Sequence, residues 1–146
     1  MPRPVRLGLL VILALGLAGT EVELLLLKHT DGFWQIAPLA LIGLAIVLLA
    51  VHALAPSVAT VRALQALMLI FLVSGIVGIA LHYRGNVEWE LERMASLSGL
   101  ELFKHAVMGA TPTLAPGTMA QLGLVGLLYT YRHPATQLNP STEIHK

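Results

Sequence analysis

The sequence contains no cysteine, and charged residues are scarce in it. Without cysteine the chain has no disulfide, no thiolate nucleophile and no cysteine-ligated zinc or iron–sulfur site. Only 12% of the 146 residues are charged and the formal net charge is +1, so no basic surface for nucleic acid is expected. These absences exclude thiol chemistry and argue against a nucleic-acid partner.

The usual catalytic motifs are missing as well. The chain has no His-Glu-x-x-His zinc motif, no Gly-x-Ser-x-Gly elbow and no glycine-rich phosphate loop. Membrane enzymes that act on lipids do not always carry such motifs, but they need polar groups gathered in one cavity. The apolar segments here consist mostly of Leu, Ala, Ile, Val and Gly. Catalysis is therefore not the expected function, and no cofactor is assigned.

Long apolar segments dominate what is present. Hydrophobic residues make up 56% of the chain and the mean hydropathy is +0.78, far above that of an ordinary soluble domain. About 20 apolar residues cross a hydrocarbon layer of about 30 Å. We therefore predict an all-α integral membrane four-helix bundle in one domain, 1–133, followed by a polar cytoplasmic tail, 134–146. The predicted spans are 5–27, 36–54, 58–82 and 117–131, and small residues such as Gly16, Gly78, Gly123 and Gly126 are expected at their contacts.

The first apolar segment has a second interpretation. Arg3 and Arg6, an apolar stretch and small residues at Ala18 and Gly19 are also typical of a cleaved signal peptide. Four further leucines, 24–27, extend the segment beyond the usual short core of a signal peptide. A membrane span is the favoured interpretation.

Residues 83–116 form one long outer loop in this prediction. Asn86 is suited to cap a short helix, and Ser98 with Glu101 resembles a capping box that opens a second one. Both short helices would be amphipathic and would lie at the membrane surface over the mouth of the bundle. The loop is expected to present Trp89 and Phe103 to a partner.

The positive charges suggest which way the chain crosses the membrane. Short segments that flank membrane helices carry more Lys and Arg on the cytoplasmic side of the membrane than on the outer side. With both termini in the cytoplasm, that side carries five cations: Arg3, Arg6, Arg62, Arg132 and Lys146. Small size and a basic start suggest a bacterial inner membrane.

Glu21 and Glu23 are the sharpest functional signal, because an ionisable group within a spanning helix is costly. They lie in the outer third of the first span and are two residues apart, so they occupy nearly opposite helix faces. They cannot act as a paired-carboxylate site on an unbroken helix. Each is a candidate for proton or cation binding, and polar packing near the interface is the alternative.

Three histidines are expected on the outer side: His29, His82 and His105. Histidines drawn from separate segments can bind a metal ion, and two of them can ligate a haem axially. Their spacing matches no ligand motif, and interfacial histidines are commonly just solvated. A ligand site and simple solvation both stay open.

The segment Lys28-His29-Thr30-Asp31-Gly32-Phe33, which follows Glu21-Val22, resembles the end of the first helix in small multidrug resistance transporters. The resemblance implies that Glu21 binds protons and cationic substrates in antiport. It covers about the first quarter of the chain. The Glu-to-Lys spacing is one residue shorter than in that family, the family's Tyr/Trp-Gly signature is missing, and the loop 83–116 has no counterpart there, so membership is not claimed.

Two functions are compatible with the sequence. The favoured one is a small, non-catalytic accessory or structural subunit of a larger membrane complex or homo-oligomer, which presents Trp89 and Phe103 to its partner. The alternative is a small proton- or cation-coupled transporter that uses Glu21. In a third interpretation the outer loop covers only its own bundle.

Overall fold

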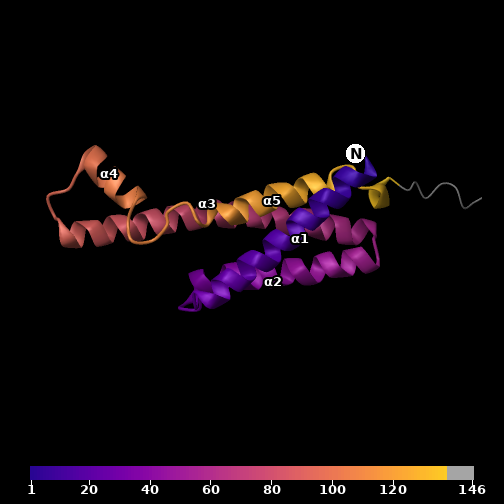
Figure 1. Cartoon of the computed structure of the whole chain (residues 1–146), viewed down its shortest axis with the longest axis horizontal. Helices are drawn as coiled ribbons and strands as arrows, with labels where there is room; N and C mark the ends of the chain where they lie inside the picture. Colours follow the sequence, from indigo (N-terminus) through magenta and orange to yellow (C-terminus); the bar gives the residue numbers. More distant parts are fainter. Residues whose placement is uncertain (138–146) are drawn as a thin grey trace, which may run out of the picture.

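The protein is helical throughout the part that the structure describes. The structure, a computed structural model, describes residues 1–137, and no strand occurs among them. In chain order the elements are α1 (Arg3–Leu26), α2 (Phe33–Leu54), α3 (Val58–Arg93), α4 (Gly99–Val107), α5 (Gly117–Thr130) and the short 3-10 helix η1 (Pro134–Thr136) (Figure 1). The predicted all-helical class is confirmed for these residues. From 138 onward, the predicted polar tail lies outside the described residues.

Three of the helices, α1, α2 and α3, are long and apolar enough to cross a membrane. Large side chains such as Leu15, Val47 and Val73 are at least 60% exposed on the outside of these helices. Exposed apolar surface on this scale is expected where lipid rather than water is the solvent. The 14 residues of α5 cover only about 21 Å, less than the hydrocarbon layer.

The helices α3 and α5 pack backbone against backbone. A β-carbon added at Gly75 would lie 2.5 Å from the backbone nitrogen of Ala120, and one added at Gly123 would lie 2.7 Å from the carbonyl oxygen of Met68. Only glycine permits so close an approach. At three other glycines expected to mediate packing, Gly16, Gly78 and Gly126, an added β-carbon would meet side-chain atoms of Leu122, Pro116 and Met68, so these glycines also lie at helix contacts, as predicted.

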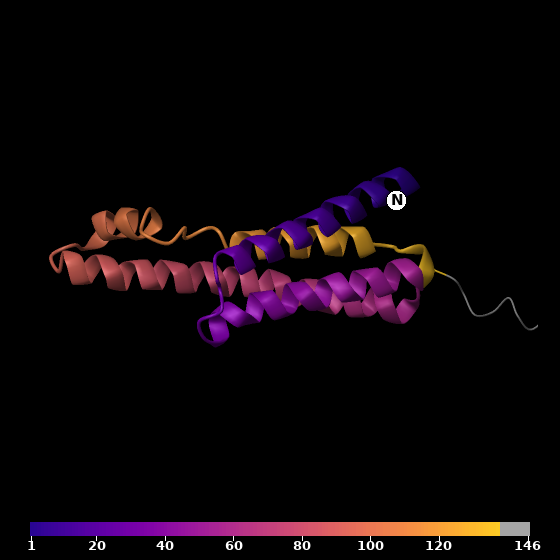
Figure 2. The same cartoon turned by 60° about the horizontal axis from the view of Figure 1, so that its bottom comes forward.

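One apolar core joins the long helices. Leu13 and Leu17 of α1, Ile42 of α2 and Phe71 of α3 are each at most 1% exposed. The helix α1 contacts both α2 and α5, and it crosses the other helices at an angle, so that it separates from α2 toward its own N-terminus (Figures 1 and 2). We call the end of the molecule that carries Arg3, Arg6, Arg62 and Arg132 the basic end.

The helix α3 is longer than the sequence predicted. It continues without a break through Arg93, so the expected end at residue 82 and the expected helix start at Asn86 are wrong. Its 36 residues cover about 54 Å. Residues 63–83 carry no charged side chain and suffice to cross a bilayer, so the last ten residues, from Arg84, extend about 15 Å further. Charged residues are good helix formers, so polarity alone does not end a helix.

The short helix expected after Ser98 is present as α4, but its surroundings differ from the prediction. The Ser98 side chain makes no capping hydrogen bond, whereas a capping box forms at Ser57 and Thr60, at the start of α3. The helix α4 lies beside the projecting part of α3, beyond the ends of α1, α2 and α5 (Figures 1 and 2). It does not cover the mouth of the bundle.

Candidate functional sites at the two ends of the helices

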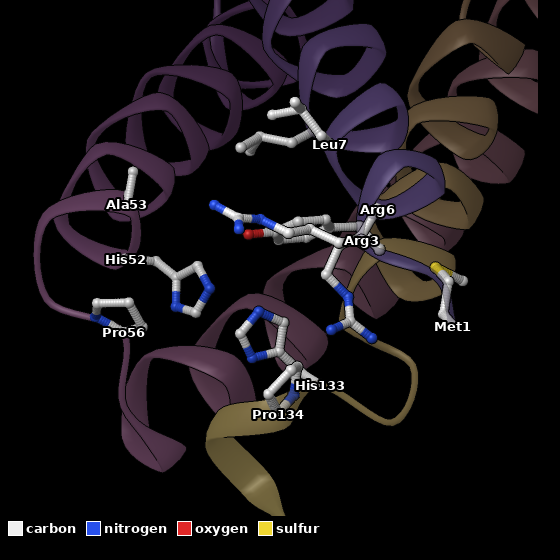
Figure 3. A pocket seen from close by; sticks show the side chains of 11 residues that line it. Met1, Arg3, Arg6, Leu7, His52, Ala53, Pro56, His133 and Pro134 are labelled. Carbon is white, nitrogen blue, oxygen red and sulfur yellow. The ribbon is translucent and has the colours of Figure 1, made fainter.

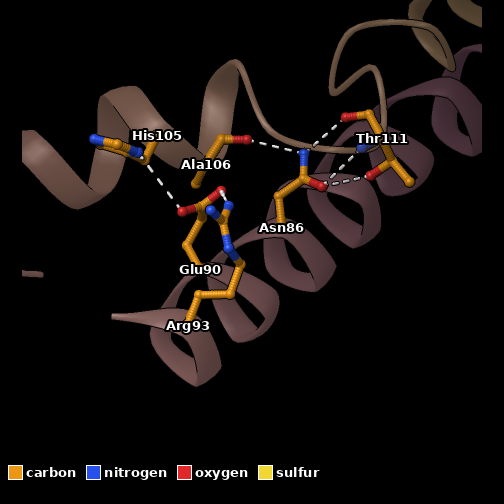
Figure 4. Close-up of polar contacts among 6 residues, drawn as sticks. All are labelled: Asn86, Glu90, Arg93, His105, Ala106 and Thr111. Carbon is orange, nitrogen blue, oxygen red and sulfur yellow. Dashed lines mark hydrogen bonds and ion pairs between the residues drawn. The ribbon is translucent and has the colours of Figure 1, made fainter. Parts of the chain in front are cut away.

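The projecting part of α3, the helix α4 and the chain that joins them to Thr111 form one unit, residues 84–111, which we call the outer arm. Asn86, only 2% exposed, holds this unit together. Its side-chain amide donates to the carbonyl oxygens of Ala106 (2.9 Å) and Thr111 (2.7 Å) and to the hydroxyl of Thr113 (3.1 Å). Its side-chain oxygen accepts hydrogen bonds from the backbone N–H and the hydroxyl of Thr111 (Figure 4). Because both the nitrogen and the oxygen of this amide are hydrogen-bonded, Asn86 holds the arm in one arrangement.

One turn further along α3, Glu90 is 4% exposed and faces α4. One carboxylate oxygen lies 3.6 Å from Nδ1 of His105, and the other lies 3.7 Å from a terminal guanidinium nitrogen of Arg93 (Figure 4). The oxygen nearest His105, Oε2, has no hydrogen-bond partner. The Glu90 carboxylate therefore lies between α3 and α4, next to a side chain from each helix.

The two aromatic residues predicted to face a partner both lie on the outer arm. Trp89 is 43% exposed, and the guanidinium carbon of Arg93 lies 4.5 Å from its ring centroid, a cation–π contact. Phe103, on α4, is half-exposed and its ring lies 6.0 Å from that of Tyr83. The apolar side chains of Leu100 and Met108 are exposed on the same unit. The arm is thus rigid at its centre and apolar on part of its surface.

The two acidic residues of α1 occupy different environments. Glu21 is half-buried and faces α2, where a β-carbon at Gly43 would lie 3.8 Å from its Oε1 atom, while Glu23 is exposed. The Oε2 atom of Glu21 is buried without a hydrogen-bond partner. The Glu21 carboxyl group therefore lies between the two helices, next to Gly43.

The three histidines expected on the outer side do not share one site. Burial lowers the pKa of His29, and the charge of His82 lowers it further. Nδ1 of His82 lies 3.0 Å from the carbonyl oxygen of Pro112. His105, on α4, faces Glu90 instead, and Glu90 lies eight residues, about 12 Å, further along α3 than His82. Among residues 1–137, no group of three or more His, Asp or Glu side chains is placed to hold a metal ion.

A second group of polar residues, at the basic end, was not singled out from the sequence as a site. His52 and His133 are buried, and their ring centroids lie 4.8 Å apart. The ring of Tyr129 lies within 6 Å of both. These residues come from α2, from α5 and from the turn after it, so no local motif connects them. The only sequence signal is that each falls at the same predicted side of the membrane.

Comparison with known proteins gives no relative from which a function could be carried over: no protein-family model, curated protein or solved structure matches this chain.

Proposed function

We propose that this protein is a non-catalytic accessory subunit of a larger membrane complex, and that its outer arm binds a different protein at the outer membrane surface. The proposed setting is a bacterial inner membrane crossed four times, with both termini in the cytoplasm. The observation that carries the proposal is the outer arm itself. It projects beyond the other helices, it is fixed by buried hydrogen bonds, and it leaves apolar side chains exposed.

The fixed geometry of the arm supports binding rather than simple solvation. Asn86 and Glu90 together attach α4 to α3, and Gly109 allows the chain to pass so close that an added β-carbon would lie 2.8 Å from the Asn86 side chain. A segment that only linked two membrane helices would not need buried polar contacts of this kind. Preorganisation reduces the entropy lost when a partner binds.

The exposed side chains of the arm have the composition of a binding surface. Trp89, Phe103, Leu100 and Met108 are all at least 43% exposed, and aromatic residues in particular carry binding energy at protein interfaces. Charged residues, among them Arg84, Glu92 and Lys104, are exposed on the same unit. Exposed apolar side chains among charged ones fit a protein partner with a complementary apolar patch.

The proposed fourth span is α5 together with its flanking residues. It packs along α3 through glycine contacts over most of its length, and Arg132 lies 5.7 Å from the ring centroid of Tyr131 at its end. Aromatic and basic residues at a helix end are typical of a membrane–water interface. An even number of spans returns the chain to the side on which it started.

Purification from native membranes in a mild detergent, followed by mass spectrometry, tests the proposed function. The wild-type protein should co-purify with a different membrane protein in fixed stoichiometry. Trp89→Ala and Phe103→Ala should each lower its recovery strongly, since an aromatic anchor contributes about 2 kcal/mol or more. Trp34→Ala and Phe33→Ala are matched controls, because these exposed aromatics lie at the α1–α2 turn, off the arm. Recovery of the protein alone, or only with further copies of itself, would contradict the proposal.

A second function is favoured by one observation, the buried and unpartnered Oε2 atom of Glu21. A carboxyl group in a spanning helix can take up a proton or a cation, as a small coupled transporter requires. In vesicles with a pH gradient, the wild-type protein should then transport a lipophilic cation in exchange for protons. Glu21→Gln should abolish this transport, whereas Glu23→Gln should not. Equal transport by Glu21→Gln would remove this candidate.

A further inference from the structure

The basic end contains a pocket of about 580 Å³ between α1, α2 and the segment after α5. Figure 3 shows arginine and histidine side chains directed into one space from opposite walls. Its lining residues are Met1, Arg3, Arg6, Leu7, Leu10, His52, Ala53, Pro56, Tyr129, His133 and Pro134. No acidic residue is among them. A pocket of this size is large enough for a small-molecule ligand.

The charge of this pocket is positive, and one of its two arginines is fixed in place. A terminal nitrogen of Arg6 donates to the carbonyl oxygens of Tyr131 (3.4 Å) and Arg132 (3.1 Å), which ties α1 to the chain after α5. The Nε atom of Arg6 is buried and has no hydrogen-bond partner. Arg3 makes no hydrogen bond or ion pair with any residue in the described range 1–137. Two arginines in a pocket whose lining contains no acidic residue form a site for an anion.

The histidines add polar groups to the same pocket from the other side. Nδ1 of His133 accepts a hydrogen bond from the backbone N–H of Ala135, which places the proton of the neutral ring on Nε2. Nδ1 of His52 lies 2.7 Å from the hydroxyl of Thr60. Each histidine therefore uses one nitrogen for structure and keeps the other for a ligand. Burial is the main cause that lowers the pKa of His133, and an anion in the pocket would oppose that effect.

An apolar groove continues from the pocket along the membrane helices. It measures about 330 Å³ and lies where α1 separates from α2. All eight of its lining residues are Leu, Ile or Ala: Leu10, Ala14, Leu17, Ala18, Ile46, Leu49, Ala50 and Ala53. Leu10 and Ala53 also line the pocket, so the two spaces adjoin. Along α1 the groove covers about 12 Å.

We propose that this pocket and groove together bind one anionic phospholipid, with the phosphate at Arg3 and Arg6 and an acyl chain between α1 and α2. The site and the lipid have the same sequence of polar and apolar parts. The cationic pocket lies at the membrane boundary, where the phosphate would be, and the adjoining apolar groove runs toward the membrane interior, where the acyl chain would be. Basic pockets between membrane helices on the cytoplasmic side are typical lipid headgroup sites. The bound lipid would fill the gap between two helices that otherwise diverge.

The apolar groove distinguishes a lipid from a soluble anion. A free phosphate or a phosphorylated metabolite would use only the arginines and leave Ala14 and Ala50 without a role in binding. The groove opens between helices that face lipid, so an acyl chain reaches it without leaving the bilayer.

Native mass spectrometry of the full chain in detergent can compare phosphatidylglycerol with phosphatidylcholine of identical acyl chains, and glycerol 3-phosphate can be added as the soluble competitor.

The wild-type protein should retain one phosphatidylglycerol with roughly a tenfold preference over phosphatidylcholine. Arg3→Gln should lower that preference roughly three- to tenfold, whereas Arg62→Gln, an exposed arginine at the same end but outside the pocket, should not. Ala14→Phe should lower retention of both lipids by filling the groove. Ala66→Phe, an exposed position on α3, is its control. Ala50→Leu repeats the groove test if Ala14→Phe does not fold.

Several outcomes would overturn the proposal. Equal retention of the two lipids, or equal effects of Arg3→Gln and Arg62→Gln, would show that the pocket does not select the anion. Displacement of phosphatidylglycerol by equimolar glycerol 3-phosphate, or unchanged retention in both groove variants, would show a soluble-anion site instead. The lipid site is independent of the outer arm, so loss of the protein partner leaves this test unaffected.

Discussion

The side chain of Asn86 donates a hydrogen bond of 2.9 Å to the carbonyl oxygen of Ala106, which lies 20 residues further along the chain. Both residues are buried, at 2% and 0% exposure, although both lie outside the segment of α3 proposed to cross the membrane. This contact makes the outer arm a structured unit rather than a flexible connection. The binding proposed for Trp89 and Phe103 depends on it.

Asn86→Ala should loosen the outer arm without unfolding the membrane helices. The change leaves the Thr111 N–H without its partner and removes one donor from the Ala106 carbonyl, which keeps the hydroxyl of Thr113, at a cost of roughly 1–3 kcal/mol. Hydrogen exchange followed by mass spectrometry should show faster exchange over residues 99–111. Arg84→Ala is the control, since its ion pair with Glu88 is largely exposed and contributes little. Unchanged exchange in Asn86→Ala would show that the apolar contacts alone hold the arm.

Gly75→Ala should destabilise the contact between α3 and α5. The added methyl group would lie 2.5 Å from the backbone nitrogen of Ala120, and overpacking of this kind costs roughly 1–3 kcal/mol. Thermal unfolding in detergent should show a lower midpoint. Gly85→Ala lies on the same helix with open space around it and should be stabilising by roughly 0.5–1 kcal/mol. If both variants shifted the midpoint alike, α3 and α5 would not pack as described.

Stability should fall as the pH is lowered below about 6.5. Burial lowers the pKa of His133, and the neighbouring His52 and Arg6 lower it further. Because the folded-state pKa lies below the unfolded-state value, the unfolded chain binds more protons between the two. Stability is then complete above the unfolded-state pKa and is lost as the pH falls through the folded-state pKa.

Thermal unfolding between pH 5 and pH 8 measures this effect. His133→Asn provides the comparison, because asparagine can still accept the hydrogen bond from Ala135 but does not titrate. The variant should lose less stability at low pH than the wild type. If stability fell with pH in the same way in His133→Asn and in the wild type, the loss of stability at low pH would come from groups other than His133.

The proposed topology can be tested directly because the chain contains no cysteine. A single cysteine at Ser98, exposed on the arm, should react with a membrane-impermeant maleimide in intact spheroplasts. A cysteine at Ala55, exposed in the α2–α3 turn, should react only after the membrane is opened. The reverse pattern would place the arm in the cytoplasm.

Apolar length and charge were sufficient to predict the membrane class, because about 20 uncharged residues suffice to span a bilayer. The bounds of α1, α2 and α5 lie close to the ranges read from the sequence. The continuation of α3 beyond Tyr83 was missed because a change from apolar to charged residues marks the end of a membrane span, not the end of a helix. Asn86 favours helix caps locally, but its side chain is used here in a tertiary contact.

The sites depend on contacts between distant segments, which a single sequence does not reveal. Trp89 and Phe103 stand out in the sequence because aromatic residues in a polar segment are unusual, and their role in binding stays a prediction. His52 and His133 could not, because each alone looks like an ordinary interfacial histidine. Their proximity arises because α2 and α5 run in the same direction and both end at the basic end (Figure 1).

Site-specific photo-crosslinking at position 103 in living cells tests the central claim most directly. A photoreactive phenylalanine analogue there should give one crosslinked product with a different membrane protein, and Trp89→Ala in the same chain should remove that product. The analogue at Leu15, which is exposed on α1 away from the arm, should not form it. Crosslinks from position 103 only to lipid, or only to a second copy of the chain, would contradict an accessory role that depends on the outer arm.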